Sequence, residues 1–390
     1  MAFGLRCACG LVCCSPVSTE APAEALAEAP AAVWTVRRVL LWTQQRFAKS
    51  GLSSPRLDAE VLLSHCLGKT RVGLYLSFEQ PLVDQELAEY RELIKRRLAG
   101  EPVAYLVGQR EFFSLPLHVT PAVLIPRPET ELLVEEALRL LKIAQDQPGQ
   151  PEPSEVMADA EPEPEPVQTV AVPGVAVTVQ YDPEPTVAQV APAETEASKS
   201  VAQPAEPVAI AVTPEAQTVV DVGTGSGAIA LAIKHERPSV RMIAIDRSPA
   251  ALEVARGNAA SLNLAIEFLE DDLLSTLPAE VAPDLLTANL PYIPTADLAG
   301  LSKDVQSEPR LALDGGADGL LLIERLVTMA ARRLTPGAAI LLEVGAGQAP
   351  AVEKLLRQAG FVEVHSLRDL AGIERVVSGR RPVESSRRLA

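Results

Sequence analysis

Short apolar runs recur along the second half of the chain, each separated from the next by a helical pattern. Three of them, Thr218–Val222, Met242–Ile245 and Leu285–Ala288, hold almost no polar residues. Such runs are typical of parallel strands that are buried on both faces. Further strands are expected at Ile266–Leu269, Ala338–Val344, Phe361–His365 and Arg375–Ser378, and a helix at Leu320–Leu334. The alternation predicts a doubly wound α/β domain over residues 218–382, mostly parallel, with an antiparallel edge near its C-terminus.

The pattern before residue 100 is helical instead. Apolar residues from Val36 to Phe47 recur with a period near 3.6. The stretch Ser53-Ser54-Pro55 is a helix-start signal, and an amphipathic helix is expected over Leu87–Leu98, ending at Gly100. We therefore expect a small helical domain over residues 33–100, which serves either to recognise a substrate protein or to cap the larger domain.

Residues 101–144 read as a connector between these two parts. Phe112-Phe113, Leu117–Val119 and Val123–Ile125 have strand character. They are followed by Pro126–Glu131, with helix-start chemistry, and by a helix over Leu132–Lys142.

Residues 145–217 differ from the rest of the chain in composition. The formal net charge of the chain is −16, and this segment holds thirteen acidic residues and one basic residue, so it carries −12 of that total. Repeated Glu-Pro pairs at 161–166 exclude a helix interior or a sheet ladder. We expect a disordered acidic insertion; a docking arm for a basic partner is the alternative.

The termini add little chemistry. Residues 1–32 and 383–390 are expected to be an unstructured extension and a tail. Four of the five cysteines lie in the extension, at positions 7, 9, 13 and 14, and the fifth is Cys66. These cysteines could bind a soft metal, but an unstructured extension without metal is favoured. A signal peptide fits the sequence less well. No run reaches the roughly 18 apolar residues that span a membrane, and a reducing cytoplasm is expected.

The run at Thr218–Val222 leads into Gly223-Thr224-Gly225-Ser226-Gly227 and then into a predicted helix. A strand, a Gly-rich turn and a helix N-terminus form the geometry that approaches a nucleotide cofactor. Asp246 closes the next strand about 20 residues later, where an acid binds ribose hydroxyls. The spacing G-x-G-x-G differs from the G-x-G-x-x-G of dinucleotide enzymes, so no pyrophosphate is implied.

The run Leu285–Ala288 ends in Asn289-Leu290-Pro291-Tyr292. Ligands of open α/β sheets bind at the carboxyl ends of strands. An Asn amide and a Tyr ring there could hold a planar amide or an amino-substituted base. The alternative is a turn in which Asn and Pro only end the strand.

Together these segments resemble the HemK/PrmC family, the N5-glutamine methyltransferases that modify peptide chain release factors. The residues that carry the resemblance are Glu101–Gly108, Leu124–Glu131, Asp221–Gly227, Asp246 and Asn289–Tyr292. The resemblance implies a class I S-adenosylmethionine (SAM) methyltransferase fold, SAM as cofactor, no metal, and transfer of a methyl group to the glutamine of the release-factor Gly-Gly-Gln motif. Leu290 departs from the family's usual Pro, at a position that contributes its main-chain carbonyl.

The resemblance also implies roles at the site. Asn289 Oδ1 and the Leu290 carbonyl would accept the two N–H bonds of the substrate amide, Pro291 would stiffen the loop, and Tyr292 would pack on the amide plane. The turn Gly223–Gly227 would pass under the cofactor and Asp246 would hold its ribose. The expected cofactor contacts are completed by Asp272 and Leu273 at the adenine edge, by Asn289, and, as weaker candidates, by Glu129 and Thr130 at the methionine end.

Three other functions remain open from the sequence. A DNA adenine-N6 methyltransferase shares the Asn-x-Pro-Tyr logic but needs a basic DNA-tracking surface, which the chain does not offer. A ribosomal-protein glutamine methyltransferase generally departs from the Arg127–Glu131 pattern. A SAM-binding protein without activity is disfavoured by Asn289 and Tyr292. We expect release factors as partners, neither nucleic acid nor membrane, and a monomer.

Overall fold

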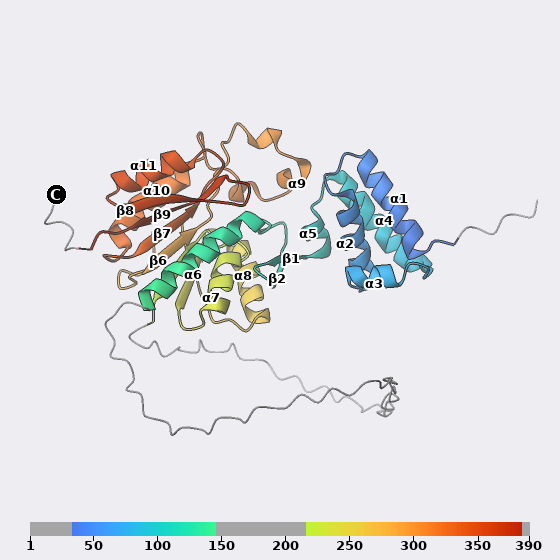
Figure 1. The fold of residues 1–390 in the computed structure, drawn as a ribbon, viewed down its shortest axis with the longest axis horizontal. Helices are drawn as coiled ribbons and strands as arrows, with labels where there is room; N and C mark the ends of the chain where they lie inside the picture. The colour runs from blue at the N-terminus through green and yellow to red at the C-terminus, as the bar shows by residue number, and fades with distance from the viewer. Residues whose placement is uncertain (1–32, 146–215, 384–390) are drawn as a thin grey trace, which may run out of the picture.

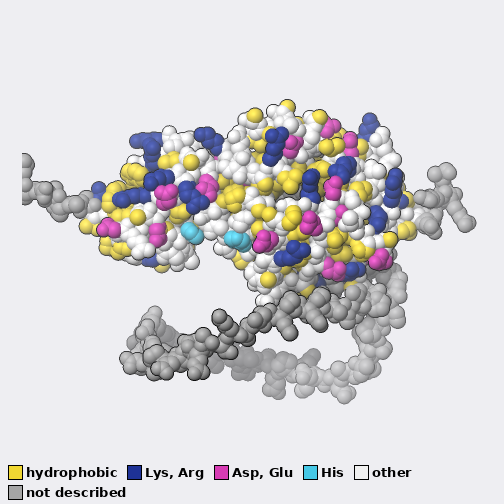
Figure 2. Space-filling model, turned by 180° about the vertical axis from the view of Figure 1, so that it is seen from behind, with side chains coloured by type: hydrophobic (Ala, Val, Ile, Leu, Met, Phe, Trp, Pro, Cys, Tyr) yellow, Lys and Arg dark blue, Asp and Glu magenta, His cyan; other side chains and the backbone are white. Residues whose placement is uncertain are grey.

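The computed structural model describes residues 33–145 and 216–383. The expected extension 1–32, nearly all of the expected insertion 145–217 and nearly all of the expected tail 383–390 lie outside these residues. A group of helices lies at one end of the molecule and an α/β part at the other (Figure 1). Seen from behind, the helical part narrows to a waist where it meets the α/β part, and Lys and Arg side chains gather on it near that waist (Figure 2).

Four helices form the first part of the chain. They are α1 (Val36–Lys49), α2 (Pro55–Leu67), α3 (Arg71–Leu76) and α4 (Asp84–Ala99). Thr35 begins α1 by accepting a hydrogen bond from the Arg38 N–H at 3.4 Å, and Thr70 begins α3 in the same way with Gly73 at 3.1 Å. Gly100 ends α4 in the left-handed conformation at φ 109°, where a residue without Cβ is favoured.

The helical part has its own core. Phe47 of α1, Leu62 and Leu63 of α2, and Tyr90 of α4 are fully or almost fully buried in one cluster. The Tyr90 hydroxyl donates to the Ala59 carbonyl at 3.0 Å, so the one polar atom that this ring buries is paired.

The connector contains α5 (Val103–Val107), the antiparallel strands β1 (Gln109–Phe112) and β2 (Leu115–His118), the short 3-10 helix Pro128–Thr130, and α6 (Glu131–Gln145). The expected strand at Val123–Ile125 is absent from the described connector. Its backbone pairs with side chains instead: the Val123 carbonyl accepts from the Tyr105 hydroxyl at 2.6 Å, and the Ile125 N–H donates to the Glu308 carboxylate at 3.3 Å. Apolar spacing alone could not distinguish this buried loop from a strand.

Seven strands form the main sheet. They are β3 (Thr218–Val222), β4 (Arg241–Asp246), β5 (Glu267–Glu270), β6 (Leu285–Ala288), β7 (Ala339–Glu343), β8 (Val362–Arg368) and β9 (Glu374–Arg380). Their order is β5-β4-β3-β6-β7-β9-β8, parallel except that β9 runs antiparallel to both β7 and β8. The predicted doubly wound sheet and its antiparallel C-terminal edge are confirmed.

Helices cover both faces of this sheet (Figure 1). Those of the main sheet are α7 (Ala228–Glu236), α8 (Pro249–Ser261), α10 (Leu321–Arg333) and α11 (Ala349–Gln358). Alternate residues of β3 face opposite sides: Val220 and Val222 pack in the cluster that includes α10 and α11, and Val219 packs in the cluster that includes α6 and α7. Two buried faces explain why these strands lack the polar alternation of a half-exposed sheet.

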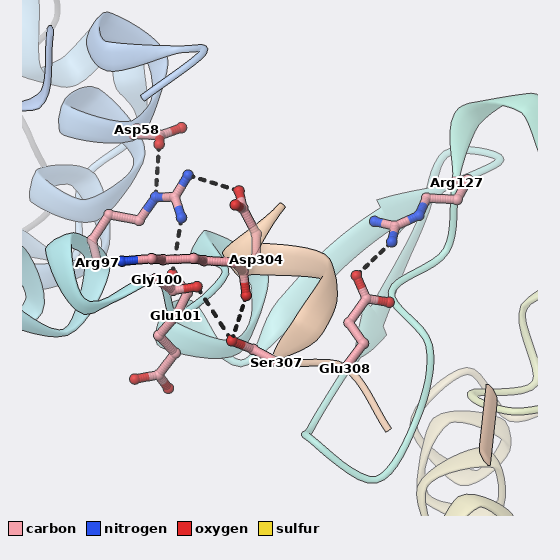
Figure 3. Close-up of polar contacts among 9 residues, drawn as sticks. Asp58, Arg97, Gly100, Glu101, Arg127, Asp304, Ser307 and Glu308 are labelled. Carbon is pink, nitrogen blue, oxygen red and sulfur yellow. Dashed lines mark hydrogen bonds and ion pairs between the residues drawn. The ribbon is translucent and has the colours of Figure 1, made fainter. Parts of the chain in front are cut away.

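The segment between β6 and α10 joins the α/β part to the helical part (Figure 3). It contains α9 (Lys303–Gln306). The buried Arg97 guanidinium of α4 pairs with Asp58 at 2.8 Å and with Asp304 of α9 at 3.1 Å. Glu308 pairs with Arg127 of the connector. These contacts tie the segment after Asn289 to both earlier parts of the chain.

Within the described ranges, the helices are too short or too polar for any of them to cross a membrane.

Candidate active site

The Gly-rich turn follows the carboxyl end of β3, which lies between strands β4 and β6 in the sheet. Gly223, Gly225 and Gly227 have φ values of 74°, 56° and 86°, a region that side chains with Cβ rarely adopt. Gly223 also permits a close approach, because a Cβ there would lie 2.9 Å from Leu290 Cδ2. The cofactor turn and the Asn289 loop are therefore packed against each other.

Asp246 ends β4 directly beneath this turn. Its carboxylate accepts from the Gly225 N–H and from the Ser248 N–H, both at 2.9 Å. Burial raises the pKa of Asp246, and these backbone hydrogen bonds oppose that rise. The predicted neighbourhood of Asp246 and the glycines is present in the structure.

One cavity opens at this edge of the sheet. It is lined by residues of the connector between 122 and 130, by the turn 222–229, by the ends of β4, β5 and β6, and by residues 309–322. Of the residues predicted for the site, Gly223, Thr224, Gly225, Ser226, Asp246, Asp272, Leu273, Asn289, Leu290 and Pro291 line it, together with Thr130. Gly227, Glu129 and Tyr292 are not among its lining residues.

Two residues after β5 stand where the adenine edge was expected. Leu273 is buried and has a φ of 64°, and the Asp272 carboxylate pairs with Arg325 of α10 at 2.7 Å. Asp271 also lines the cavity, although it was not predicted to bind. Its N–H donates to the Asp246 carbonyl at 3.1 Å, so the two strand ends are joined.

The Asn289 side chain is oriented by a residue distant in sequence. Its Nδ2 atom donates to the Thr130 hydroxyl oxygen at 3.2 Å. Among the described residues no donor reaches Asn289 Oδ1 or the Leu290 carbonyl. The side chain of Leu290 is buried against Gly223, so this residue offers the cavity its main chain.

Tyr292 is held just beyond the cavity. Its carbonyl accepts from the Gln348 side-chain amide at 2.9 Å, and a Cβ at Gly345 would lie 3.2 Å from the ring. Burial raises the pKa of Tyr292 to about 12, and the Glu343 charge adds to that rise. The hydroxyl therefore stays protonated at neutral pH.

Two buried acids accompany the site. Asp221 in β3 accepts from the Thr287 hydroxyl at 2.9 Å, and burial raises its pKa to about 6. Glu343, the last residue of β7, was not predicted to take part. An apolar strand that ends in an acid was the signal that identified Asp246, and it could have identified Glu343 as well.

The cavity suits SAM in the arrangement of its polar groups. A turn with glycines at three of its five positions and a carboxylate hydrogen-bonded to it match an adenosine ribose, and the apolar Leu273 matches a base. Within residues 33–145 and 216–383, no group of His, Cys, Asp and Glu residues could hold a metal ion.

Two family models match the chain: the PrmC N-terminal domain over residues 38–108 and the methyltransferase small domain over residues 208–298. Similar proteins include the release factor glutamine methyltransferase of Geobacter sulfurreducens, 35% identical over 89% of this chain and 97% of that protein. That of Moorella thermoacetica is 38% identical over 87% of this chain and 96% of that protein.

A solved protein-(glutamine-N5) methyltransferase (release factor-specific) from Alicyclobacillus acidocaldarius is 25% identical over 68% of this chain and 99% of its own, with a TM-score of 0.31. The strand order of the sheet, its Gly-rich turn and the methyltransferase small domain identify the fold as that of a class I SAM methyltransferase. Given the extent of these curated matches, the chain belongs to the release factor glutamine methyltransferase family.

Proposed function

We propose that this chain transfers the methyl group of SAM to the side-chain amide nitrogen of the glutamine in the Gly-Gly-Gln motif of a peptide chain release factor. The observation that carries the proposal is the placement of Asn289. Its amide oxygen is unpaired among the described residues, it borders the same cavity as the glycine turn and Asp246, and its nitrogen is tied to Thr130.

The cofactor is assigned to the turn and the strand ends around it. Gly223, Thr224, Gly225, Ser226 and Gly227 would hold the methionine and ribose, and Asp246 would bind the ribose hydroxyls. Asp272 and Leu273 would border the adenine, with Asp271 beside them. Bound SAM supplies a methyl group on a positively charged sulfur, which a nitrogen lone pair can attack.

The substrate amide needs acceptors rather than a strong base. Its lone pair is delocalised into the carbonyl, so alignment is the contribution that the protein can make. Asn289 Oδ1 and the Leu290 carbonyl accept the two N–H bonds and stabilise the positive charge that develops on the nitrogen. As the new N–C bond forms, the methyl–sulfur bond would break with its electron pair left on the sulfur as a neutral thioether, and one N–H proton would then leave to water. Tyr292 stands beside this loop to limit the position of the amide.

Leu290 is compatible with this chemistry. The working group at this position is a main-chain carbonyl, which any residue supplies. Its side chain fills the space over Gly223, so packing replaces part of the rigidity that a proline ring provides.

The remaining parts have proposed roles. The helices of residues 33–100 recognise the release factor, residues 101–144 connect them to the catalytic part, and residues 218–382 carry out the transfer. The protein acts in the cytoplasm as a monomer and without direct contact to nucleic acid.

The experiment uses the full chain, SAM labelled in its methyl group, and a release factor. Label is expected on the release factor, and mass spectrometry of its peptides should place one methyl group on the Gly-Gly-Gln glutamine. A release factor with that glutamine changed to glutamate, and duplex DNA, should remain unlabelled. Label on DNA, or on no acceptor, would contradict the proposal.

A further inference from the structure

Glu343 lies beside Asn289 at the carboxyl edge of the sheet. Strands β6 and β7 are parallel neighbours with Ala288 opposite Leu342, so the residues that follow, Asn289 and Glu343, come side by side. The Glu343 side chain is buried, with 2% of its residue surface exposed. Its Oε2 atom has no hydrogen-bond partner among the described residues. A buried carboxylate that is not fully paired lowers stability and calls for an explanation.

Thr130 pairs with Asn289 and also lowers the pKa of Glu343. Its hydroxyl oxygen accepts from Asn289 Nδ2 at 3.2 Å, and a hydroxyl has a single proton, which remains free to be donated. Burial raises the pKa of Glu343 to about 7, while hydrogen bonding by Thr130 and Asn289 lowers it. Both influences favour the charged form of the carboxylate.

The other charged groups around Glu343 do not neutralise it by direct pairing. Arg375 of β9 lowers its pKa, but that guanidinium is paired with Asp369 at 3.0 Å. Glu129 raises the Glu343 pKa through its own negative charge. Tyr292, the remaining titratable neighbour, stays protonated at neutral pH. The acid is thus held next to Asn289 without an ion-pair partner, as is common for groups that serve function rather than stability.

Resting on the function proposed above, we propose that Glu343 is a positioning residue that acts through Thr130. The carboxylate accepts the Thr130 proton, which leaves the Thr130 oxygen to accept from Asn289. The Asn289 amide is thereby fixed with Nδ2 toward Thr130 and with Oδ1 toward the cavity.

This orientation decides whether the substrate can bind productively. The substrate glutamine presents N–H donors and needs an acceptor. An Asn289 amide turned by half a rotation would present its own NH2 group, and two donors would face each other. In E343Q the new side-chain amide can donate to Thr130. This allows the opposite order of hydrogen bonds, in which Thr130 donates to Asn289 Oδ1.

The test compares the wild type with E343Q, T130V, T130S and the double variant E343Q/T130V in the release-factor assay. E343Q and T130V keep the side-chain volume and should lower kcat about 10- to 100-fold, the range expected when a reacting group is misplaced. T130S keeps the hydroxyl and should restore turnover. The kcat of the double variant should be no lower than that of the more impaired single variant, because both substitutions break the same chain of hydrogen bonds.

Two readouts separate positioning from a merely structural role. The Kd of E343Q for SAM, measured by calorimetry, should stay within about twofold of the wild-type value, since Glu343 does not line the cavity. The ratio of wild-type to E343Q kcat should fall toward one below about pH 7, where Glu343 becomes protonated.

Wild-type turnover in E343Q, a T130S variant as slow as T130V, losses that multiply in the double variant, or loss of SAM binding in parallel with activity would each overturn the inference. Absence of methyl transfer by the wild type would instead overturn the proposed function. The two failures are therefore distinguishable in one set of measurements.

Discussion

Two buried glutamates, one in each part of the molecule, have pKa values that are shifted in opposite directions. Glu60 of α2 and Glu343 of β7 are 0% and 2% exposed. Glu60 receives hydrogen bonds from Arg56 at 2.7 Å, from Arg71 at 2.7 Å and from the Tyr75 hydroxyl. Burial alone would raise its pKa, but these partners lower the pKa to about 2. At Glu343 burial prevails and the pKa rises to about 7.

The difference shows that burial does not fix the charge of an acid; its partners do. In the helical part the Glu60 carboxylate is fully paired by Arg56, Arg71 and Tyr75. At the carboxyl edge of the sheet, Asn289 Oδ1 and Glu343 Oε2 lack full partners among the described residues. The Glu60 cluster therefore contributes to stability, whereas the Asn289 loop retains unpaired groups that a substrate can use.

The largest expected effect is the loss of methyl transfer when the unpaired amide oxygen of Asn289 is removed. Asn289→Ala should lower kcat by about 1000-fold, because it removes an acceptor for the charge that develops on the substrate nitrogen. SAM binding should stay within a few-fold by calorimetry. Gln358→Ala, which removes an exposed amide at the end of α11, is the control and should turn over normally. An Asn289→Ala variant that is nearly as fast as the wild type would contradict the assigned role.

The unfolding free energy of Glu343→Gln tests the acid itself. A folded pKa of about 7 against an ordinary 4.5 means that the native state binds more protons between these pH values. The stability from this group is present below about pH 4.5 and is lost as the pH rises through 7. The variant should therefore gain about 3 kcal/mol on the wild type over that interval in urea titrations. A difference that does not change with pH would show that the pKa of Glu343 is not raised in the folded protein.

Asp246→Ala addresses a third acid, which accepts hydrogen bonds from the backbone N–H groups of Gly225 and Ser248. We expect the Kd for SAM to rise about 30-fold, the loss of charged hydrogen bonds to ribose hydroxyls worth about 2 kcal/mol. Calorimetry with Asp297→Ala, an exposed acid of the segment after β6, as the control would measure it. Unchanged affinity would remove Asp246 from the ribose site.

The smallest effect on methyl transfer is expected at Glu60, in the helical part, where only the stability should change. Glu60→Gln should lower the free energy of unfolding by about 2 kcal/mol at pH 7, less than a fully buried pair would lose because both arginines reach solvent. Since the folded pKa of Glu60 is depressed to about 2, this contribution is present above about pH 4.5 and disappears as the pH falls toward 2. Turnover should not change. A loss of methyl transfer without unfolding would show that the helical part contributes directly to catalysis.

The sequence was sufficient where the signal is local. The strands before Gly223, Asp246 and Asn289 follow from apolar runs, and the turn follows from its glycines. It was insufficient where neighbours depend on strand order. The Asn289–Thr130 contact joins residues 159 positions apart, and the place of Glu343 beside Asn289 depends on the pairing of β6 with β7. The strand predicted at Val123–Ile125 was wrong for a similar reason, because the Ile125 backbone N–H pairs with the side chain of the distant Glu308.

The route of the chain around residues 146–215 has a consequence for how the protein can be divided. Residues 139–141 of α6 and Gln217 before β3 line one hollow at the edge of the sheet opposite the cavity. The chain therefore leaves and re-enters the α/β part far from Asn289. Two separately expressed pieces, cut within this segment, should reassemble through the buried contact of α6 with α7. The first piece would bring Thr130 and the second Asn289 and Glu343, so methyl transfer would report their association.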